Sequence, residues 1–410
     1  MCNITNNLIL IMKKNFKSLF LVLPLVLFFS CSGDDNITPI PSSQISKTFA
    51  LGSIDDNSVT GTAKFIKNED NSTTVELDFT AIPTGGSHPA HIHYNTAAEG
   101  GGIAITLGTV NGDTGFSSIT FTTLDDGTPI TYDELMSFDG YINVHESETQ
   151  LNIIVAQGDI GQNELTGVSK TYSLGEKDIP GISGTAVFSE RENGEALAVI
   201  QLSNTISGEM HPAHIHNNTA VEGGNIAFTF NPVDGDTGKS VTNVSQLDDA
   251  ISFLYLDVVD FDGYINVHES DMTLGTIIAQ GDIGQNELTG ESIVYLLSEV
   301  DMSGVSGRTT FYGRTNGEAL AVIELQNTPI DGVHPAYIYS NDVATTGDII
   351  FTFNPVDGNT GISQTNLAVL DNDTVFGFED VLGVNGHINV HLSEILINMI
   401  IAQGNIGSND

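Results

Sequence analysis

Histidine is rare in this chain and is concentrated in one repeated hexapeptide. Of the 11 histidines in 410 residues, seven lie in HPAHIH at 88–93, HPAHIH at 211–216 and HPAYIY at 334–339. If the hexapeptide is a β-strand, alternate side chains share one face, so His91 and His93 point the same way. Two imidazoles at this spacing can converge on one metal ion, because metal–nitrogen bonds are about 2.0–2.1 Å long.

A third ligand has to come from another strand, and each of the first two stretches has one candidate. His145 and His268 each end a Tyr-Ile-Asn-Val-His segment. The sequence therefore predicts two three-nitrogen sites, formed by His91, His93 and His145 and by His214, His216 and His268. Neutral imidazole suits copper, zinc, nickel or iron, and we expect copper or zinc. The alternative is a structural cluster in which the imidazoles hydrogen-bond to backbone carbonyls.

The first histidine of each hexapeptide needs a separate interpretation. His88, His211 and His334 directly precede a proline. Each lies three residues before the first position of the ligand pair, which is a tyrosine in the third stretch. A residue before proline is held in extended geometry, away from the face that the ligand pair shares. We expect these three histidines to be hydrogen-bonding braces, because the third stretch keeps this histidine and loses the other two.

The third stretch exchanges histidine and tyrosine between two segments. Tyr337 and Tyr339 replace the ligand pair, while His387 replaces Tyr141 and His391 is kept. A reciprocal exchange predicts that the two strands touch at these positions. We expect this third site to be degenerate and free of metal.

Three copies of one domain follow each other at an interval of 123 residues. The HPA triplets begin at 88, 211 and 334, and the NVH motifs end at 145, 268 and 391. Short apolar segments separated by Gly, Asn and Asp turns, including an Asn-Gly hairpin signal in ENGE, predict seven or eight strands in each copy. This pattern favours an all-β fold of three Greek-key β-sandwiches or flattened barrels, spanning 46–168, 169–291 and 292–410.

Composition excludes several classes of function. The chain has 12 Lys and Arg against 52 Asp and Glu, a formal net charge of −40. Without a basic surface, nucleic acid is not expected as a partner. Both cysteines, Cys2 and Cys31, lie near the start of the chain, which excludes disulfides, thiolate metal sites and a cysteine nucleophile in the repeated domains.

The first 31 residues have the features of a signal peptide. Three lysines precede an apolar run from Leu19 to Phe29, and Ser30 and Cys31 follow it. A cysteine at this place resembles the lipobox of bacterial lipoproteins, which implies lipidation of Cys31 and a membrane as partner. The following SGDDN resembles the export signal of surface lipoproteins in Bacteroidetes, which implies an outer-membrane, cell-surface location. Residues 32–45 are polar and contain proline, as expected of a tether.

The histidine motifs also resemble a known family. HPAHIH followed by GYINVH and a strand ending in AQG is similar to the CHRD domain, and the resemblance covers all three copies. It implies a β-sandwich found in surface proteins and names no activity.

The spacing of His88, His91 and His93 is similar to that in copper/zinc superoxide dismutases. That resemblance implies copper at the two predicted triads and makes a dismutase-like copper oxidoreductase the alternative function. The bridging histidine, the zinc-loop histidines and the disulfide of those enzymes are absent here, and no arginine is near the motif. We therefore expect a surface-displayed binding or scaffold protein with an unidentified ligand, with no catalytic residues, rather than an enzyme.

Overall fold

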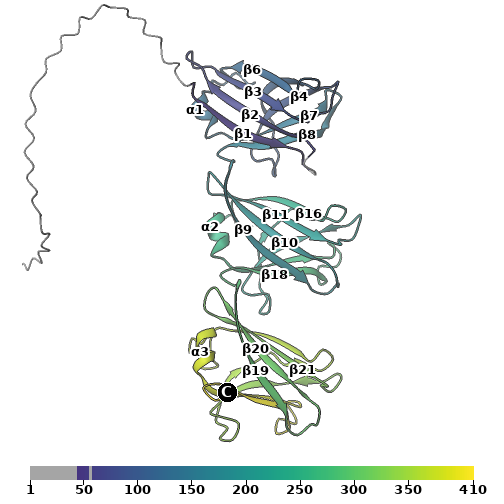
Figure 1. Cartoon of the computed structure of the whole chain (residues 1–410), viewed down its shortest axis with the longest axis vertical. Coiled ribbons are helices and arrows are strands. Elements are labelled where there is room, and N and C mark those ends of the chain that lie inside the picture. Colours follow the sequence, from purple (N-terminus) through teal and green to yellow (C-terminus); the bar gives the residue numbers. More distant parts are fainter. Residues whose placement is uncertain (1–43, 55–57) are drawn as a thin grey trace, which may run out of the picture. The chain divides into compact units, whose positions relative to one another are not determined.

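The computed structural model describes residues 44–54 and 58–410, and there it shows an all-β fold of repeated domains, as predicted. The predicted signal peptide, Cys31 and residues 32–43 of the predicted tether lie outside the described residues. Within the described ranges, no helix is long and apolar enough to cross a membrane. Figure 1 shows the strands and the short helix of each copy. Each copy encloses its own apolar core.

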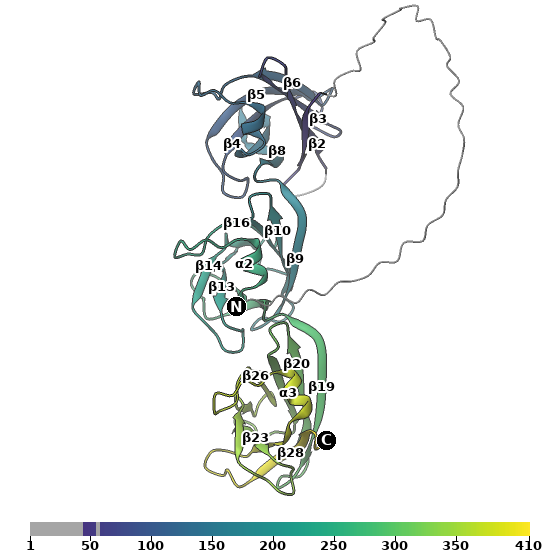
Figure 2. The same ribbon diagram turned by 90° about the vertical axis from the view of Figure 1, so that its left-hand side faces the viewer.

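The first copy is a closed barrel (Figure 2). Its strand order is β1-β2-β3-β6-β5-β4-β7-β8. Because β3 pairs with β6 and β4 pairs with β7, the connectivity is of the Greek-key type. Its elements are β1 (Ser46–Gly52), β2 (Thr60–Lys67), β3 (Thr73–Phe79), β4 (Ser87–Tyr94), β5 (Ile103–Asn111), β6 (Phe116–Phe121), α1 (Tyr132–Leu135), β7 (Asp139–Ser147) and β8 (Gln150–Gly161).

The second copy has the same connectivity with two interrupted strands, giving the order β12-β15-β16-β11-β10-β9-β18-β17-β13-β14. Its elements are β9 (Leu165–Glu176), β10 (Ser183–Arg191), β11 (Ala196–Ser203), β12 (Met210–His211), β13 (Ala213–Asn217), β14 (Ile226–Thr229), β15 (Val233–Asp234), β16 (Lys239–Val244), α2 (Tyr255–Val259), β17 (Asp262–His268) and β18 (Ile277–Gly284).

The third copy has the order β24-β23-β27-β28-β19-β20-β21-β26, with β22 and β25 paired separately. Its elements are β19 (Leu288–Glu299), β20 (Ser306–Arg314), β21 (Ala319–Gln326), β22 (Val333–His334), β23 (Ala336–Ser340), β24 (Ile349–Thr352), β25 (Val356–Asp357), β26 (Ile362–Leu367), α3 (Phe378–Gly383), β27 (Asn385–His391) and β28 (Ile400–Gly407).

Proline explains why the second and third copies are interrupted where the first is continuous. Thr109 lies inside β5, whereas the equivalent positions are Pro232 and Pro355, between β14 and β15 and between β24 and β25. Proline has no N–H to donate to the ladder, so the strand pairing stops there.

The cores follow from strand alternation. In β4 and β7, Ile92, Ile142 and Val144 are fully buried and belong to the first core cluster. The short helix α1 packs Tyr132 and Leu135 onto this cluster. Since alternate residues point to opposite faces, the side chains between these apolar residues lie on the outer face of the barrel.

Two sequence expectations can be compared with strand positions. The predicted Asn-Gly hairpin is present, because β10 and β11 pair and Gly194 at their turn has a φ of 84°. Strand β9 begins at Leu165, which pairs with Arg191 of the second copy, four residues before the expected boundary at 169.

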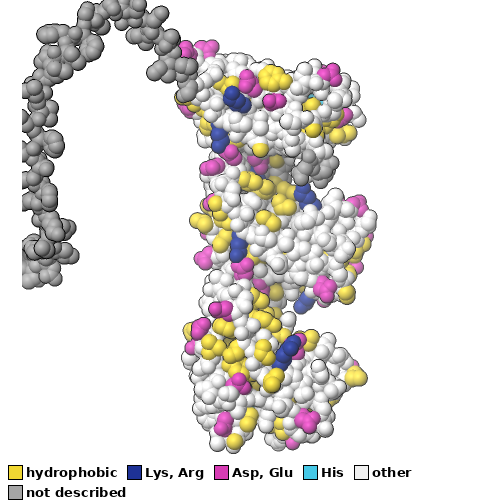
Figure 3. All heavy atoms as spheres, viewed as in Figure 1, with side chains coloured by type: hydrophobic (Ala, Val, Ile, Leu, Met, Phe, Trp, Pro, Cys, Tyr) yellow, Lys and Arg dark blue, Asp and Glu magenta, His cyan; other side chains and the backbone are white. Residues whose placement is uncertain are grey.

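The surface carries the acidic excess of the composition. On the face shown in Figure 3, acidic side chains are scattered over the three copies and outnumber the lysines and arginines.

Candidate metal centre

Two neighbouring strands bring the three histidines of the first copy together. His91 and His93 lie on β4, which pairs with β7 so that His91 is opposite Asn143 and His93 is opposite Tyr141. His145 is two residues beyond Asn143 on β7 and shares its face. The three imidazoles therefore project from the outer face of the barrel, opposite the apolar core.

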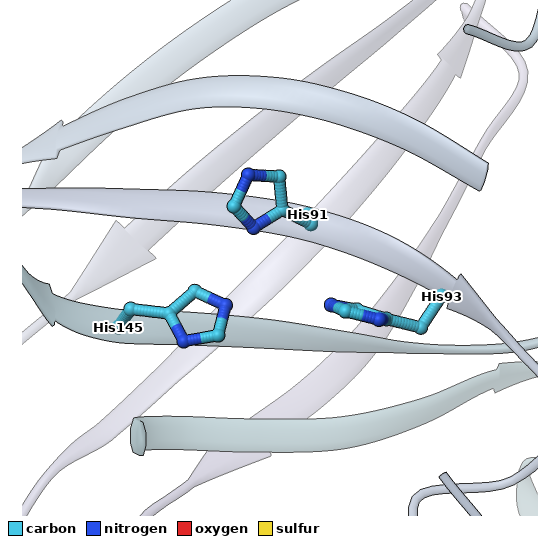
Figure 4. Close-up of side chains that lie close together, drawn as sticks. All are labelled: His91, His93 and His145. Atoms are coloured by element: carbon cyan, nitrogen blue, oxygen red, sulfur yellow. The ribbon is translucent and has the colours of Figure 1, made fainter. Parts of the chain in front are cut away.

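The rings face one another around a common point (Figure 4). Their centroids are 5.9 Å apart for His91 and His93, 5.2 Å for His91 and His145, and 6.3 Å for His93 and His145. The second copy repeats these separations at 5.9, 5.2 and 6.3 Å for His214, His216 and His268. In each of these two triads, one nitrogen from every histidine lies within 4.8 Å of one nitrogen of each of the other two. All six side chains are buried.

Backbone carbonyls fix the orientation of some of these rings. Nδ1–H of His93 donates to the carbonyl of Gly101 at 2.9 Å, and Nδ1–H of His216 donates to that of Gly224 at 3.0 Å. Nδ1–H of His268 donates to the carbonyl of Leu274 at 2.7 Å. A histidine whose Nδ1 carries the proton keeps a free lone pair on Nε2, the arrangement that metal-binding histidines use.

Several of the other imidazole nitrogens are buried without a hydrogen-bond partner. Among the described residues, Nε2 of His93 and Nδ1 of His91 have no hydrogen-bond partner, and neither do Nε2 of His216 and Nδ1 of His214. A buried polar atom without a partner costs about 1–3 kcal/mol. A metal ion would satisfy these atoms, because tetrahedral bonds of about 2.0–2.1 Å place ligands about 3.3 Å apart. Small side-chain movements therefore suffice, and the residues fit a transition-metal ion.

The electrostatics of the triads favour neutral imidazole. Burial lowers the pKa of His91, the neighbouring ligand histidines lower it further, and Asp125 raises it. The same causes lower the pKa of His214 to about 4. Burial also lowers the pKa of His145 and of His268. At neutral pH these rings keep the lone pair that a metal ion requires.

The histidines that precede proline hydrogen-bond to backbone and do not join the triads. His88 is 1% exposed, with Nδ1 lying 3.2 Å from the carbonyl of His145 and Nε2 2.9 Å from that of Pro83. His211 and His334 contact the residue after the ligand position, with Nδ1 2.7 Å from the carbonyl of Glu269 and 2.8 Å from that of Leu392. These are the bonds expected of a brace on the strand that carries the third ligand.

The third copy closes its own site. Tyr337, Tyr339 and His391 take the triad positions, and the Tyr339 hydroxyl donates to Nε2 of His391 at 3.1 Å. His387 is opposite Tyr339, and the two rings stack with centroids 5.4 Å apart. In the first copy His93 and Tyr141 stack in the same way at 5.0 Å. The predicted contact between the exchanged residues is confirmed.

His387 hydrogen-bonds to the backbone and is not part of a triad. Its Nδ1–H donates to the carbonyl of Asn341 at 2.8 Å. Among the described residues, the only groups of three potential ligands whose atoms lie within 4.8 Å of one another are those of the first two copies.

Residues around the sites escaped sequence analysis although they recur at the same interval. Asp125 accepts hydrogen bonds from the N–H and hydroxyl of Thr106, the residue paired with His91 across the strands. Asp248 and Asp371 bind the equivalent threonines of the other two copies. The AQG motif was noted in the sequence, but its contact was not predicted: Gln157 on β8 donates to Asn143 on β7 at 2.9 Å. The 123-residue repetition of these residues was the available signal.

The comparisons with known proteins add no relative. No protein-family model matches this sequence, no curated protein matches it, and no solved structure matches it.

Proposed function

We propose that this protein binds one transition-metal ion in each of its first two copies and acts as a surface-anchored binding or scaffold protein. The observation that carries the proposal is the pair of buried three-histidine groups, each with ligand nitrogens within 4.8 Å of one another. The unpaired Nδ1 of His91 and Nε2 of His93, among the described residues, support a ligand at this point. The lipid anchor at Cys31 and the CHRD-like character of the copies are carried by sequence motifs alone.

The donor atoms limit which metal ions the triads favour. Three neutral imidazoles without thiolate or carboxylate favour copper or zinc over calcium and magnesium, which prefer oxygen ligands. Asp125 adds negative charge near His91, which favours a cation at the triad. Its carboxylate is already hydrogen-bonded to Thr106, so it acts on the ion through space.

A binding role agrees with the way in which the copies differ. The third copy keeps its strands and core while Tyr339 closes the site on His391. The fold therefore has a use that does not depend on the metal. Linking the copies raises the effective local concentration of binding sites at a surface without changing the affinity of any one site.

One observation favours a copper oxidoreductase as the second candidate. Three protein ligands leave at least one coordination position open, which is typical of catalytic metal sites. Copper-loaded protein that removes superoxide far faster than free copper would establish that candidate, and a rate no higher than that of free copper would exclude it.

Metal analysis tests the proposal directly. Purified full-length protein dialysed against copper or zinc should retain two ions per chain. His93→Ala should reduce this to one, and His93→Ala combined with His216→Ala should reduce it to none. Far-ultraviolet circular dichroism checks that the variants stay folded. Retention of two ions by the double variant would contradict the assignment.

A further inference from the structure

One buried arginine connects each of the first two copies to the copy that follows it. Arg191 on β10 is 1% exposed, and its Nη1 donates to Oδ2 of Asp159 at 2.6 Å and to the carbonyl of Asn163. Asp159 is on β8 of the first copy, whereas β10 belongs to the second. Arg314 repeats the arrangement in the third copy, with a bond of 2.7 Å to Asp282 of the second.

The residues that hold the guanidinium occur only in the copies that follow another copy. Asn243 accepts from Nε of Arg191 at 2.9 Å, and its own amide donates to Glu195 at 2.9 Å. The equivalent residues of the third copy are Arg314, Asn366 and Glu318, and those of the first copy are Asn68, Thr120 and Ser72. The common fold does not need the arginine, which belongs to the junction.

The partners of the arginine hold the loop that orients a metal ligand. We call residues 95–102, between β4 and β5, the site loop of the first copy. Oδ1 of Asp159 accepts from the N–H of Ala97 at 2.8 Å, and the amide of Asn163 donates to the carbonyl of Asn95 at 3.1 Å. The other end of the same loop supplies the carbonyl that fixes His93. Arg191 therefore contacts both residues that hold the start of the site loop, through the side chain of Asp159 and the backbone carbonyl of Asn163.

The second copy contains the same chain of contacts for its own site loop, residues 218–225. Asp282 accepts from Ala220 at 2.8 Å, Asn286 donates to the carbonyl of Asn218 at 3.1 Å, and Arg314 contacts both Asp282 and Asn286. In the third copy Asn405 accepts from Val343 at 3.0 Å and receives no arginine within the described part of the chain. That copy also lacks the histidine pair.

We propose that Arg191 and Arg314 are positioning residues for the metal site of the preceding copy, so that each site reaches full affinity only with the following copy in place. This inference rests on the proposed metal binding. The guanidinium holds Asp159 or Asp282, the carboxylate holds the start of the site loop, and the loop carbonyl holds the ring of His93 or His216. Mutation of residues that hold metal ligands in place changes metal affinity by about 10–100-fold. Because the arginine acts on the ligand through a carboxylate and a loop, we expect an effect of about tenfold.

The test uses the full chain with one site disabled at a time. In a first background, His214→Ala with His216→Ala leaves only the first site, and zinc affinity is measured by competition with a chromogenic chelator. Arg191→Asn, which introduces the residue found at Asn68, should weaken binding about tenfold, while Arg314→Asn should have no effect. In the mirror background, His91→Ala with His93→Ala, the two arginine variants should exchange their effects.

A second variant separates positioning from misfolding. Arg191→Asn leaves Asp159 without its cation, so Arg191→Asn with Asp159→Asn removes both charges and introduces residues that the equivalent positions already carry. It should weaken the first site by a similar factor. Unchanged affinity in both backgrounds, or equal losses for both arginines, would overturn this inference alone. Absence of zinc from the parent chain would instead overturn the proposed function and this inference with it.

Discussion

The hydroxyl of Tyr339 lies 3.1 Å from Nε2 of His391. Tyr339 occupies in the third copy the position that His93 holds in the first. Nδ1–H of His391 donates to the carbonyl of Ile397, so Nε2 is the acceptor of the tyrosine proton. The lone pair that would bind metal is therefore used inside the protein. The third copy therefore satisfies this buried nitrogen with a hydroxyl, whereas in the first two copies we propose that a metal ion binds the equivalent nitrogen.

Restoring the histidine pair should create a third site. The triple variant Tyr337→His, Tyr339→His and His387→Tyr gives the third copy the residues of the first at these positions. It should raise the metal content from two to three ions per chain, because the strand pairing that aligns the triad is already present. The control, Tyr337→His alone, keeps the Tyr339 hydroxyl on His391 and should stay at two ions. A folded triple variant with two ions would show that the triad residues are not sufficient.

The stability of the metal-free protein should fall as the pH falls below neutrality. The pKa of His214 is lowered to about 4, and those of His91, His145 and His268 are lowered, against about 6.5 in an unfolded chain. Below pH 6.5 the unfolded chain therefore binds protons that the folded chain does not, which favours unfolding. This contribution is complete above pH 6.5 and is lost progressively toward pH 4.

Urea unfolding of the metal-free protein at pH 7.5 and at pH 5 measures this effect, since most carboxylates are still ionised at pH 5. His214→Gln should make the dependence shallower, because it removes the group whose pKa is lowered to about 4. The same shifts extend zinc binding below pH 6.5, as protons compete poorly for rings with lowered pKa values. A midpoint of zinc release at or above 6.5 would contradict the burial of the triads.

The sequence was informative wherever a repeat or an alternation applied. The shared face of His91 and His93 follows from the two-residue period of a strand, and contact between the exchanged residues follows from the swap of Tyr141 and His387. The fold class followed from the same signals, since turn residues separate short apolar segments at fixed positions in every copy.

Features that depend on long-range contacts could not be predicted in this way. The carbonyl that orients His93 belongs to Gly101, and a backbone group leaves no signature in residue type. Arg191 differs from Asn68 in the sequence, but its meaning depends on Asp159 being 32 positions earlier and on the opposite side of a junction. Arg191 and Arg314 recur at the 123-residue interval, but residue type alone does not show which carboxylate each arginine contacts.

The site loop should be sensitive to a methyl group at one glycine and tolerant at the next. A Cβ on Gly101 would lie 2.0 Å from the carbonyl oxygen of Tyr94, so Gly101→Ala has to displace the loop and the carbonyl that holds His93. A Cβ on Gly102 would meet no atom of the described chain within 4 Å. With the second triad disabled, Gly101→Ala should weaken zinc binding about tenfold or more, and Gly102→Ala should leave it within about twofold. Equal affinities for the two variants would show that this carbonyl does not position the ligand.

Removing the brace should cost stability and leave the number of bound ions unchanged. His88 is almost fully buried between the carbonyls of His145 and Pro83. His88→Ala removes the ring N–H that donates to one of these carbonyls and creates a cavity, so we expect a loss of about 2–4 kcal/mol in the first copy. Because three domains need not unfold together, hydrogen exchange of the amides in β4 and β7 should be followed, with the equivalent strands of the other copies as internal reference. At saturating zinc the variant should still bind two ions, whereas His93→Ala should bind one and lose less protection in these strands. Loss of one ion from a His88→Ala protein with unchanged exchange would make His88 a ligand and not a brace.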